Sequence, residues 1–350
     1  MNENNIASRP DVYSLLNKLL EQNSFKDISI SLNVAVATVK RWSKLQKIPK
    51  KYTFEILKLS KINIDYTKFD FREKDQFFTP NDTANYCYNK AKTIIASYGD
   101  SCEDYSYIEP SAGNGVFLKL LPADKRIGLD IEPYDDEIIK QDFMDWEPEN
   151  DSKYIILGNP PFGLRGHMAL KFMNHSSKFA DYVCFILPQS FESDGKGSPR
   201  KRVKGLHLLY SETLKTDFES PNGKAILVQC IFQIWSKHHC NESYILDEIN
   251  NTDIKIYSLS DGGTSSTTRN KKMLNKCDIY LPFTCFGKDN MKYYSSSDSL
   301  PNKKGYGIVF NKNKKDNIIK FKNIKWNNIS FLSTNSAYNI RSSQIINEFK

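Results

Sequence analysis

The residues best suited to chemistry in this 350-residue chain are Asn159, Pro160, Pro161 and Phe162. They follow the apolar run 154–158, which is typical of a buried parallel strand that stops at its carboxyl end. In open α/β sheets, ligands bind just beyond the carboxyl ends of the strands. An Asn side-chain carbonyl beside a Pro backbone carbonyl gives two acceptors, which suit an exocyclic amino group with two hydrogens. The following aromatic ring can stack on an extruded base, although a simple strand-ending turn is the structural alternative.

Two earlier strand ends carry residues suited to holding a ligand of the nucleoside type. Gly113 and Gly115 follow a strand predicted at 105–108, and glycine lets the backbone approach a ligand closely. The loop lacks the third glycine of the dinucleotide fingerprint, and a plain tight turn would also explain its two glycines. Asp130 ends the next predicted strand, where its carboxylate can accept both hydrogens of a ribose diol. A further acidic residue and ring suited to an adenine moiety follow, Asp142 and Phe143.

The order of these motifs resembles that of the gamma-class N6-adenine DNA methyltransferases. The shared motifs are Phe-x-Thr-Pro at 77–80, Glu-Pro-x-x-Gly-x-Gly at 109–115, Gly-x-Asp-Ile-Glu-Pro at 128–133, Asp-Phe at 142–143 and Asn-Pro-Pro-Phe at 159–162. The resemblance covers about residues 75–236. It implies an α/β fold with a doubly wound, mostly parallel, seven-stranded class I methyltransferase sheet. It also implies direct transfer of a methyl group from S-adenosyl-L-methionine to the N6 amino group of a flipped adenine in DNA, without a metal.

The resemblance implies a role for each matched residue. The cofactor contacts that it implies are Glu109 and Gly113 at the methionine part, Phe78 and Thr79 closing over it, Asp130 at the ribose, and Ile131, Asp142 and Phe143 at the adenine. Gly115, in the same loop as Gly113, is also expected to contact the cofactor. At the target base, Asn159 and the Pro160 carbonyl would hold the amino group, and Pro161 completes the motif. Phe162 would stack on the target ring, with Phe218 in the position of a second ring on its other face.

The elements before the catalytic region predict a small helical domain. Leucines at 15, 16, 19 and 20 predict a helix over 11–22, Ser24 is suited to cap a second helix, and 35–45 reads as a third. Asn33 suits the tight turn between the second and third helices, so this pair resembles a helix-turn-helix. We expect Lys40 and Arg41 on its exposed side to contact duplex DNA. A three-helix domain with a solvated basic face is the alternative.

Further elements alternate between strand and helix signals, which favours a mostly parallel sheet. We expect helices at 52–62, 82–97, 115–121 and 168–178, and strands at 105–108, 126–129, 154–157, 182–187 and 225–235. We therefore predict a helix-turn-helix-like domain at 1–70, a catalytic domain at 71–240 and a β-rich or mixed target-recognition region at 241–350. The helical domain is expected to be needed for DNA binding and dispensable for cofactor binding.

The charge distribution favours a polyanionic partner. The net charge is +8 overall, with +5 over residues 1–70, −4 over 71–240 and +7 over 241–350. In the basic loop 194–204, we expect Arg200 and Arg202 to contact phosphates without reading sequence. A codon bias that enriches Lys is the alternative source of the charge.

Composition excludes several other classes of protein. No run of about 18 apolar residues is present, so we expect no membrane span, and the amino terminus lacks the features of a secretion signal. Seven scattered cysteines without a Cys-x-x-Cys pair favour free thiols in the cytoplasm over disulfides or a zinc module.

The function alternatives left open are RNA N6-adenine methylation, protein glutamine methylation and a catalytically silent DNA-binding regulator. Membership of a restriction-modification system and the oligomeric state are also open.

Overall fold

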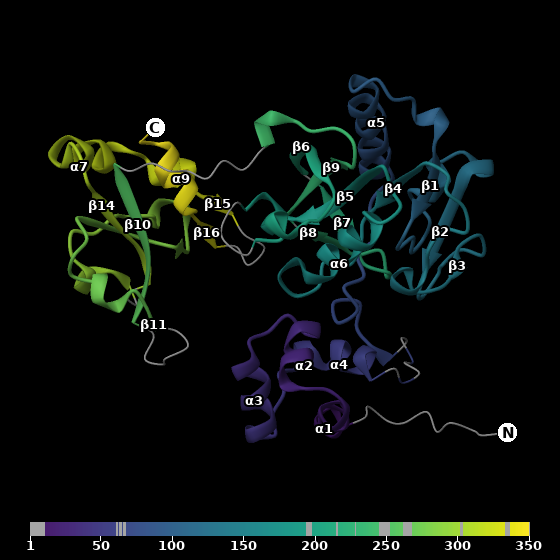
Figure 1. Cartoon of the computed structure of the whole chain (residues 1–350), viewed down its shortest axis with the longest axis horizontal. Coiled ribbons are helices and arrows are strands. Elements are labelled where there is room, and N and C mark those ends of the chain that lie inside the picture. The colour runs from purple at the N-terminus through teal and green to yellow at the C-terminus, as the bar shows by residue number, and fades with distance from the viewer. Residues whose placement is uncertain are drawn as a thin grey trace.

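The computed structural model of the chain contains a helical amino-terminal part, a central sheet and a β-rich carboxyl-terminal part (Figure 1). The structure describes residues 11–60, 62, 65, 68–193, 198–214, 216–227, 229–244, 253–261, 268–301, 304–332 and 337–349. The amino-terminal helices, purple in Figure 1, lie on one side of the central sheet, and the carboxyl-terminal part lies on another.

Four helices form the amino-terminal part. They are α1 (Val12–Gln22), α2 (Phe25–Ser31), α3 (Val36–Leu45) and α4 (Thr53–Leu59), close to the predicted ranges. Ser24 and Asp27 form a reciprocal capping box that fixes the start of α2. Leu16, Val39, Trp42 and Ile56 belong to the buried cluster that holds the four helices together.

The turn between α2 and α3 depends on Asn33, whose φ of 50° confirms the predicted left-handed conformation. The turn is closed by the amide of Val34, which donates to the carbonyl of Ser29 over 2.9 Å. Lys40, Arg41 and Lys44 of α3 are exposed, while Val39 and Trp42 are buried. One face of α3 therefore packs on the domain core and the other presents basic side chains.

A seven-stranded sheet forms the centre of the chain, with the order β3-β2-β1-β4-β5-β9-β6. Its strands are β1 (Ser106–Glu109), β2 (Arg126–Asp130), β3 (Ile139–Lys140), β4 (Tyr154–Gly158), β5 (Tyr182–Pro188), β6 (His207–Leu214) and β9 (Cys230–Ser236). The first five are parallel, and β9 runs antiparallel between β5 and β6. This order, with one late antiparallel strand, confirms the predicted class I methyltransferase fold.

The sheet is buried on both faces. Helix α5 (Asn81–Ser97) contributes Ala84, Cys87, Ala91 and Ile95 to the cluster on one face. Helix α6 (His167–Ser176) contributes Ala169, Leu170, Phe172 and Met173 to the cluster on the other. Strands β4 and β5 are buried at every residue, which explains their uninterrupted apolar sequences.

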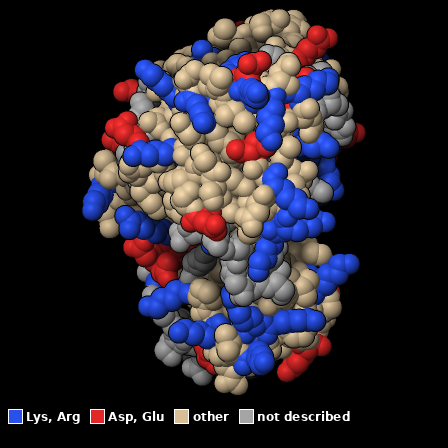
Figure 2. Space-filling view, turned by 90° about the vertical axis from the view of Figure 1, so that its left-hand side faces the viewer, with Lys and Arg blue, Asp and Glu red and all other residues tan. Residues whose placement is uncertain are grey.

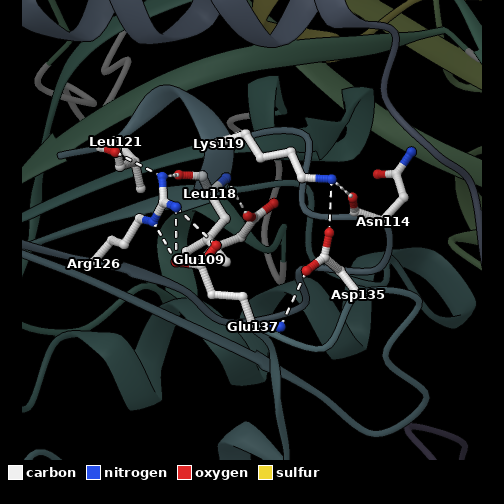
Figure 3. Close-up of polar contacts among 8 residues, drawn as sticks. All are labelled: Glu109, Asn114, Leu118, Lys119, Leu121, Arg126, Asp135 and Glu137. Carbon is white, nitrogen blue, oxygen red and sulfur yellow. Dashed lines mark hydrogen bonds and ion pairs between the residues drawn. The ribbon is translucent and has the colours of Figure 1, made fainter. Parts of the chain in front are cut away.

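The helix predicted over 115–121 is wrong, because the structure has turns followed by the short 3-10 helix Leu118–Leu120. Side-chain hydrogen bonds take the place of the backbone hydrogen bonds that a longer helix would make (Figure 3). Glu109 accepts from the Leu118 amide over 2.6 Å, and Arg126 donates to the carbonyls of Leu118 and Leu121 over 3.0 Å each. Arg126 is itself held by two hydrogen bonds of 2.8 Å to Glu137. Polar side chains therefore fix the loop that follows β1 without an α-helix.

A small hairpin lies between β6 and β9 in sequence, so the single strand predicted over 225–235 is in fact two. The hairpin pairs β7 (Asp217–Glu219) with β8 (Ala225–Leu227). Phe78 adds to it through two backbone hydrogen bonds with Glu219, of 2.7 and 2.9 Å. The segment before α5 is thereby joined to the strand that carries Phe218.

The carboxyl-terminal part combines two small sheets with three helices. Its described elements are β10 (Ile254–Asp261), β11 (Thr268–Arg269), β12 (Ile279–Pro282), β13 (Thr284–Cys285), β14 (Gly305–Phe310), α7 (Lys314–Asn323), α8 (Trp326–Ile329), β15 (Phe331–Leu332), β16 (Tyr338–Asn339) and α9 (Ser342–Asn347). Strands β10, β12 and β14 pair antiparallel around a separate apolar cluster. Arg341 donates to the Glu192 carbonyl over 2.9 Å, which links this part to the central domain. Among the described residues, no helix is long and apolar enough to cross a membrane.

Candidate active site

A cavity of about 100 Å³ opens where β1, β2 and β4 end. Of the nine residues predicted to contact a cofactor, six line it: Phe78, Gly113, Asp130, Ile131, Asp142 and Phe143. Because the cavity also reaches Asn159, it connects the predicted cofactor residues to the predicted catalytic motif.

Asp130 fixes the backbone on both sides of this cavity. Its carboxylate accepts from the amide of Gly113 over 2.7 Å and from the amide of Glu132 over 2.8 Å. Gly113 has a φ of +52°, and an added Cβ would come within 3.1 Å of the Phe78 ring, so glycine suits this position. Burial raises the pKa of the Asp130 carboxyl, although the two amides oppose that shift. A carboxylate offers about four lone-pair sites, so it retains capacity for a diol.

The apolar side of the cavity is built around Phe143. The ring is fully buried, with its centroid 5.2 Å from that of Phe172 and 4.9 Å from that of His175. Asp142 accepts from the Met144 amide over 2.9 Å, which starts the short turn that contains Phe143. A flat apolar surface beside a carboxylate is suited to a planar heterocycle with an amino group.

The other three predicted cofactor residues do not line the cavity. Glu109 is 2% exposed, and burial raises the pKa of its carboxyl well above the usual range. The structure thus places Glu109 behind the loop, where it holds the Leu118 amide (Figure 3). Gly115 has a φ of +74° in the same loop, and Thr79 is buried against Asn159.

The Asn159 side chain has a fixed orientation. Its Nδ2 donates to the Phe77 carbonyl over 3.2 Å and to the Thr79 hydroxyl over 3.3 Å. Both donor hydrogens are therefore used, and Oδ1 is left as an acceptor. Among the described residues, no hydrogen bond reaches Oδ1 of Asn159 or the carbonyl of Pro160.

A second, smaller cavity of about 10 Å³ adjoins the first. It is lined by Asp75, Phe77, Asn159, Pro160, Phe162 and Phe218. Asp75, Phe77 and Asn159 also line the larger cavity, so the two share a wall. Phe162 and Phe218, 56 residues apart in sequence, are thus brought to one site by the hairpin that pairs with Phe78.

Asp75 is a site residue that the sequence analysis missed. It has a φ of 58°, which is uncommon for a residue other than glycine. Its carboxylate accepts from the Gly163 amide over 2.5 Å, so it holds the loop that carries Phe162. Burial raises the pKa of this carboxyl, against the opposing effect of bonds from the amides of Gly163 and Phe162. No local pattern predicts this role, since the conformation of Asp75 is set by tertiary contacts.

The predicted DNA-contacting residues differ in their surroundings. Lys40 and Arg41 are exposed on α3, and Lys and Arg side chains gather over this part of the molecule in Figure 2. Arg202 is also exposed. Arg200 instead donates to the Tyr244 carbonyl over 2.5 Å and lies 5.8 Å from the Tyr244 ring centroid. Arg200 is therefore engaged within the protein, and residues 194–197 of the same loop lie outside the described residues.

No family model matches the chain, and no curated protein is similar to it in sequence. Among solved structures, it is similar to a "putative RNA methyltransferase" from Pyrococcus horikoshii, with 20% identity and a TM-score of 0.36 over 51% of this chain and 90% of that one. It is also similar to the type IIL restriction-modification enzyme MmeI in complex with DNA, with 11% identity and a TM-score of 0.35 over 59% of this chain and 43% of that one. A third similarity is to the modification subunit of a "putative type I restriction enzyme" from Vibrio vulnificus, with 10% identity and a TM-score of 0.33 over 67% of this chain and 57% of that one. The assignment of the fold rests on the strand order.

Proposed function

We propose that this protein transfers a methyl group from S-adenosyl-L-methionine to the N6 amino group of adenine in DNA. The observation that carries the proposal is the orientation of Asn159. Its amide nitrogen donates to Phe77 and Thr79, so its oxygen is left as an acceptor. The next residue, Pro160, adds a backbone carbonyl, and both residues line the smaller cavity.

The residues that line the larger cavity suit the cofactor in their chemistry. Asp130 would hold the ribose hydroxyls, and Ile131 and Phe143 would enclose the adenine, with Asp142 at its amino group. Gly113, with its left-handed backbone, lets the Phe78 ring pack close to the loop, and the methionine part would lie along these two residues in the cavity wall. The bound cofactor would supply an electrophilic methyl group on a sulfonium.

The acceptor pair accounts for activation of the target nitrogen. An adenine amino lone pair is delocalised into the ring and is a weak nucleophile. Bonds from its two hydrogens to Asn159 Oδ1 and the Pro160 carbonyl favour a pyramidal nitrogen, whose lone pair then points out of the ring plane. The arrangement acts through positioning and preorganised hydrogen bonds, and no protein nucleophile is required.

The smaller cavity would hold the target base. Phe162 offers an aromatic ring there, and stacking on such a ring contributes about 1–3 kcal/mol per base. Phe218 also lines this cavity but is 1% exposed, so it would form the buried wall behind the base. A base within a duplex cannot reach this recess, so the proposal includes base flipping. Duplex DNA is favoured over RNA because α3 presents Lys40 and Arg41 on an exposed helix face, and the major groove of A-form RNA is too narrow for a helix.

The test is methyl transfer from labelled S-adenosylmethionine to duplex DNA, single-stranded DNA, RNA and a glutamine-containing peptide. Products are digested and identified by mass spectrometry. We expect N6-methyladenine in duplex DNA. Label found only in RNA, or only in the glutamine of the peptide, would show that the proposed substrate is wrong. Absence of label from every substrate would refute methyltransferase activity.

A further inference from the structure

The wall of the larger cavity includes one residue from the amino-terminal helices, Lys58 of α4. The other described lining residues all follow position 73 in the chain. Lys58 instead comes from α4, whose residue Ile56 packs in a separate apolar cluster. Its ammonium group lies 5.1 Å from the ring centroid of Phe54, which in turn is 5.4 Å from the ring of Phe69. The side chain is thus held between the helical domain and the segment that leads into the catalytic domain.

None of the described acidic residues around this cavity forms an ion pair with Lys58. Its described acidic residues are Asp75, Asp130, Glu132 and Asp142. Of its two described cations, Lys74 is 10% exposed and pairs with Glu132 over 2.8 Å. Among the described residues, no carboxylate lies within ion-pair distance of Lys58. Lys58 lies in the cavity wall, and its charge opposes the rise in pKa that burial causes at Asp75 and Asp130.

We propose that Lys58 binds the carboxylate of the methionine part of S-adenosylmethionine, so that the helical domain forms part of the cofactor site. The proposal rests on the proposed function, because it takes the same cofactor. That carboxylate is the only anionic group of the cofactor, and the cavity otherwise presents acidic side chains. Lys58 is the described cation that is available to pair with it.

A consequence follows for the role of the amino-terminal helices. Helix α4 packs in the same cluster as α1 and α3, through Ile56, Leu16 and Val39. Cofactor bound to Lys58 would therefore hold the proposed DNA-contacting helices against the catalytic domain. The helical domain is then not dispensable for cofactor binding, in contrast to the expectation from sequence.

The experiment compares two ligands by calorimetry on the full chain. S-Adenosylhomocysteine carries the carboxylate, and 5′-methylthioadenosine shares the nucleoside and sulfur but lacks the amino-acid group. Lys58→Met should weaken binding of S-adenosylhomocysteine at least about tenfold, the scale of a lost charge-assisted hydrogen bond. It should change binding of methylthioadenosine less than about twofold, and Lys58→Arg should restore most of the affinity for S-adenosylhomocysteine. Lys44→Met, at an exposed position of α3, is the matched control and should change neither affinity.

Hydrogen exchange gives a second measurement on the wild-type chain. S-Adenosylhomocysteine should slow exchange of the amides in Thr53–Leu59, and methylthioadenosine should not. Equal loss of affinity for both ligands in Lys58→Met, or no loss for either, would overturn the proposal for Lys58. Failure of the wild-type chain to bind S-adenosylhomocysteine would instead overturn the proposed function, and with it this inference.

Discussion

Gly163 tests whether the backbone after the Asn-Pro-Pro-Phe motif positions the site. It has a φ of 64° and a ψ of 178°, a region that essentially only glycine adopts. A Cβ at this position would lie 2.7 Å from Met168 Cγ and 2.9 Å from the Met168 backbone nitrogen. That nitrogen donates to the Phe162 carbonyl over 3.1 Å, so Gly163→Ala must displace the loop that carries Phe162.

The expected loss of stability is the sum of two effects. Backbone strain of this kind costs about 1–3 kcal/mol, and overpacking costs about 1–3 kcal/mol more. Gly99→Ala is the matched control, because Gly99 also has a positive φ, of 91°, but an added Cβ would meet nothing within 4 Å. The control should lose only the cost of the left-handed backbone, about 1–2 kcal/mol.

Urea denaturation of both variants measures these losses, and methyl transfer under single-turnover conditions measures the effect on the site. Gly163→Ala should be the less stable variant and should lose most of its rate, while Gly99→Ala should keep the wild-type rate. Equal stability of the two variants, together with full activity of Gly163→Ala, would refute the structural role assigned to this loop.

Three further predictions concern Thr79, Asp130 and Glu109. Thr79→Val removes a partner of the Asn159 amide, so we expect the methylation rate to fall about fivefold, the scale of one neutral hydrogen bond, with cofactor affinity unchanged by calorimetry. Asp130→Ala should weaken binding of S-adenosylhomocysteine by about 1–3 kcal/mol, and unchanged affinity in calorimetry would remove Asp130 from the site. Burial raises the pKa of Glu109, so the native state keeps a proton that the unfolded chain releases, and stability should fall as pH rises from the unfolded pKa of about 4.3 towards the raised native value. Glu109→Gln should flatten that decline in melting temperature, and an unchanged pH profile would contradict the raised pKa.

The sequence predicted the parts of the site that depend on local chemistry. Apolar runs that end at Asp130 and Asn159 defined two parallel strands, and parallel strands bring their carboxyl ends to one edge. The order of the motifs then implied the sheet, and the strand order confirms it. The left-handed turn at Asn33 was also predictable, because asparagine tolerates that conformation.

The features that escaped prediction depend on distant contacts. The role of Asp75 follows from the amides of Gly163 and Phe162, almost 90 residues away in sequence. Lys58 reaches the cavity from a helix that, in sequence, looks like part of a separate domain. The expected helix over 115–121 was replaced by a turn because Glu109 and Arg126 satisfy its backbone groups. None of these pairings leaves a periodic signal in a single sequence.

The most direct test of the account is single-turnover methylation by Asn159→Ala on duplex DNA that contains the adenine modified by the wild-type enzyme. The lost acceptor matters most as the target nitrogen becomes pyramidal, so the rate should fall at least about a hundredfold. Affinity for S-adenosylhomocysteine should remain within about twofold of wild type, because the predicted cofactor contacts are separate. Methylation by Asn159→Ala at the wild-type rate would contradict the account, and Asn-Pro-Pro-Phe would then be only a turn at the end of β4.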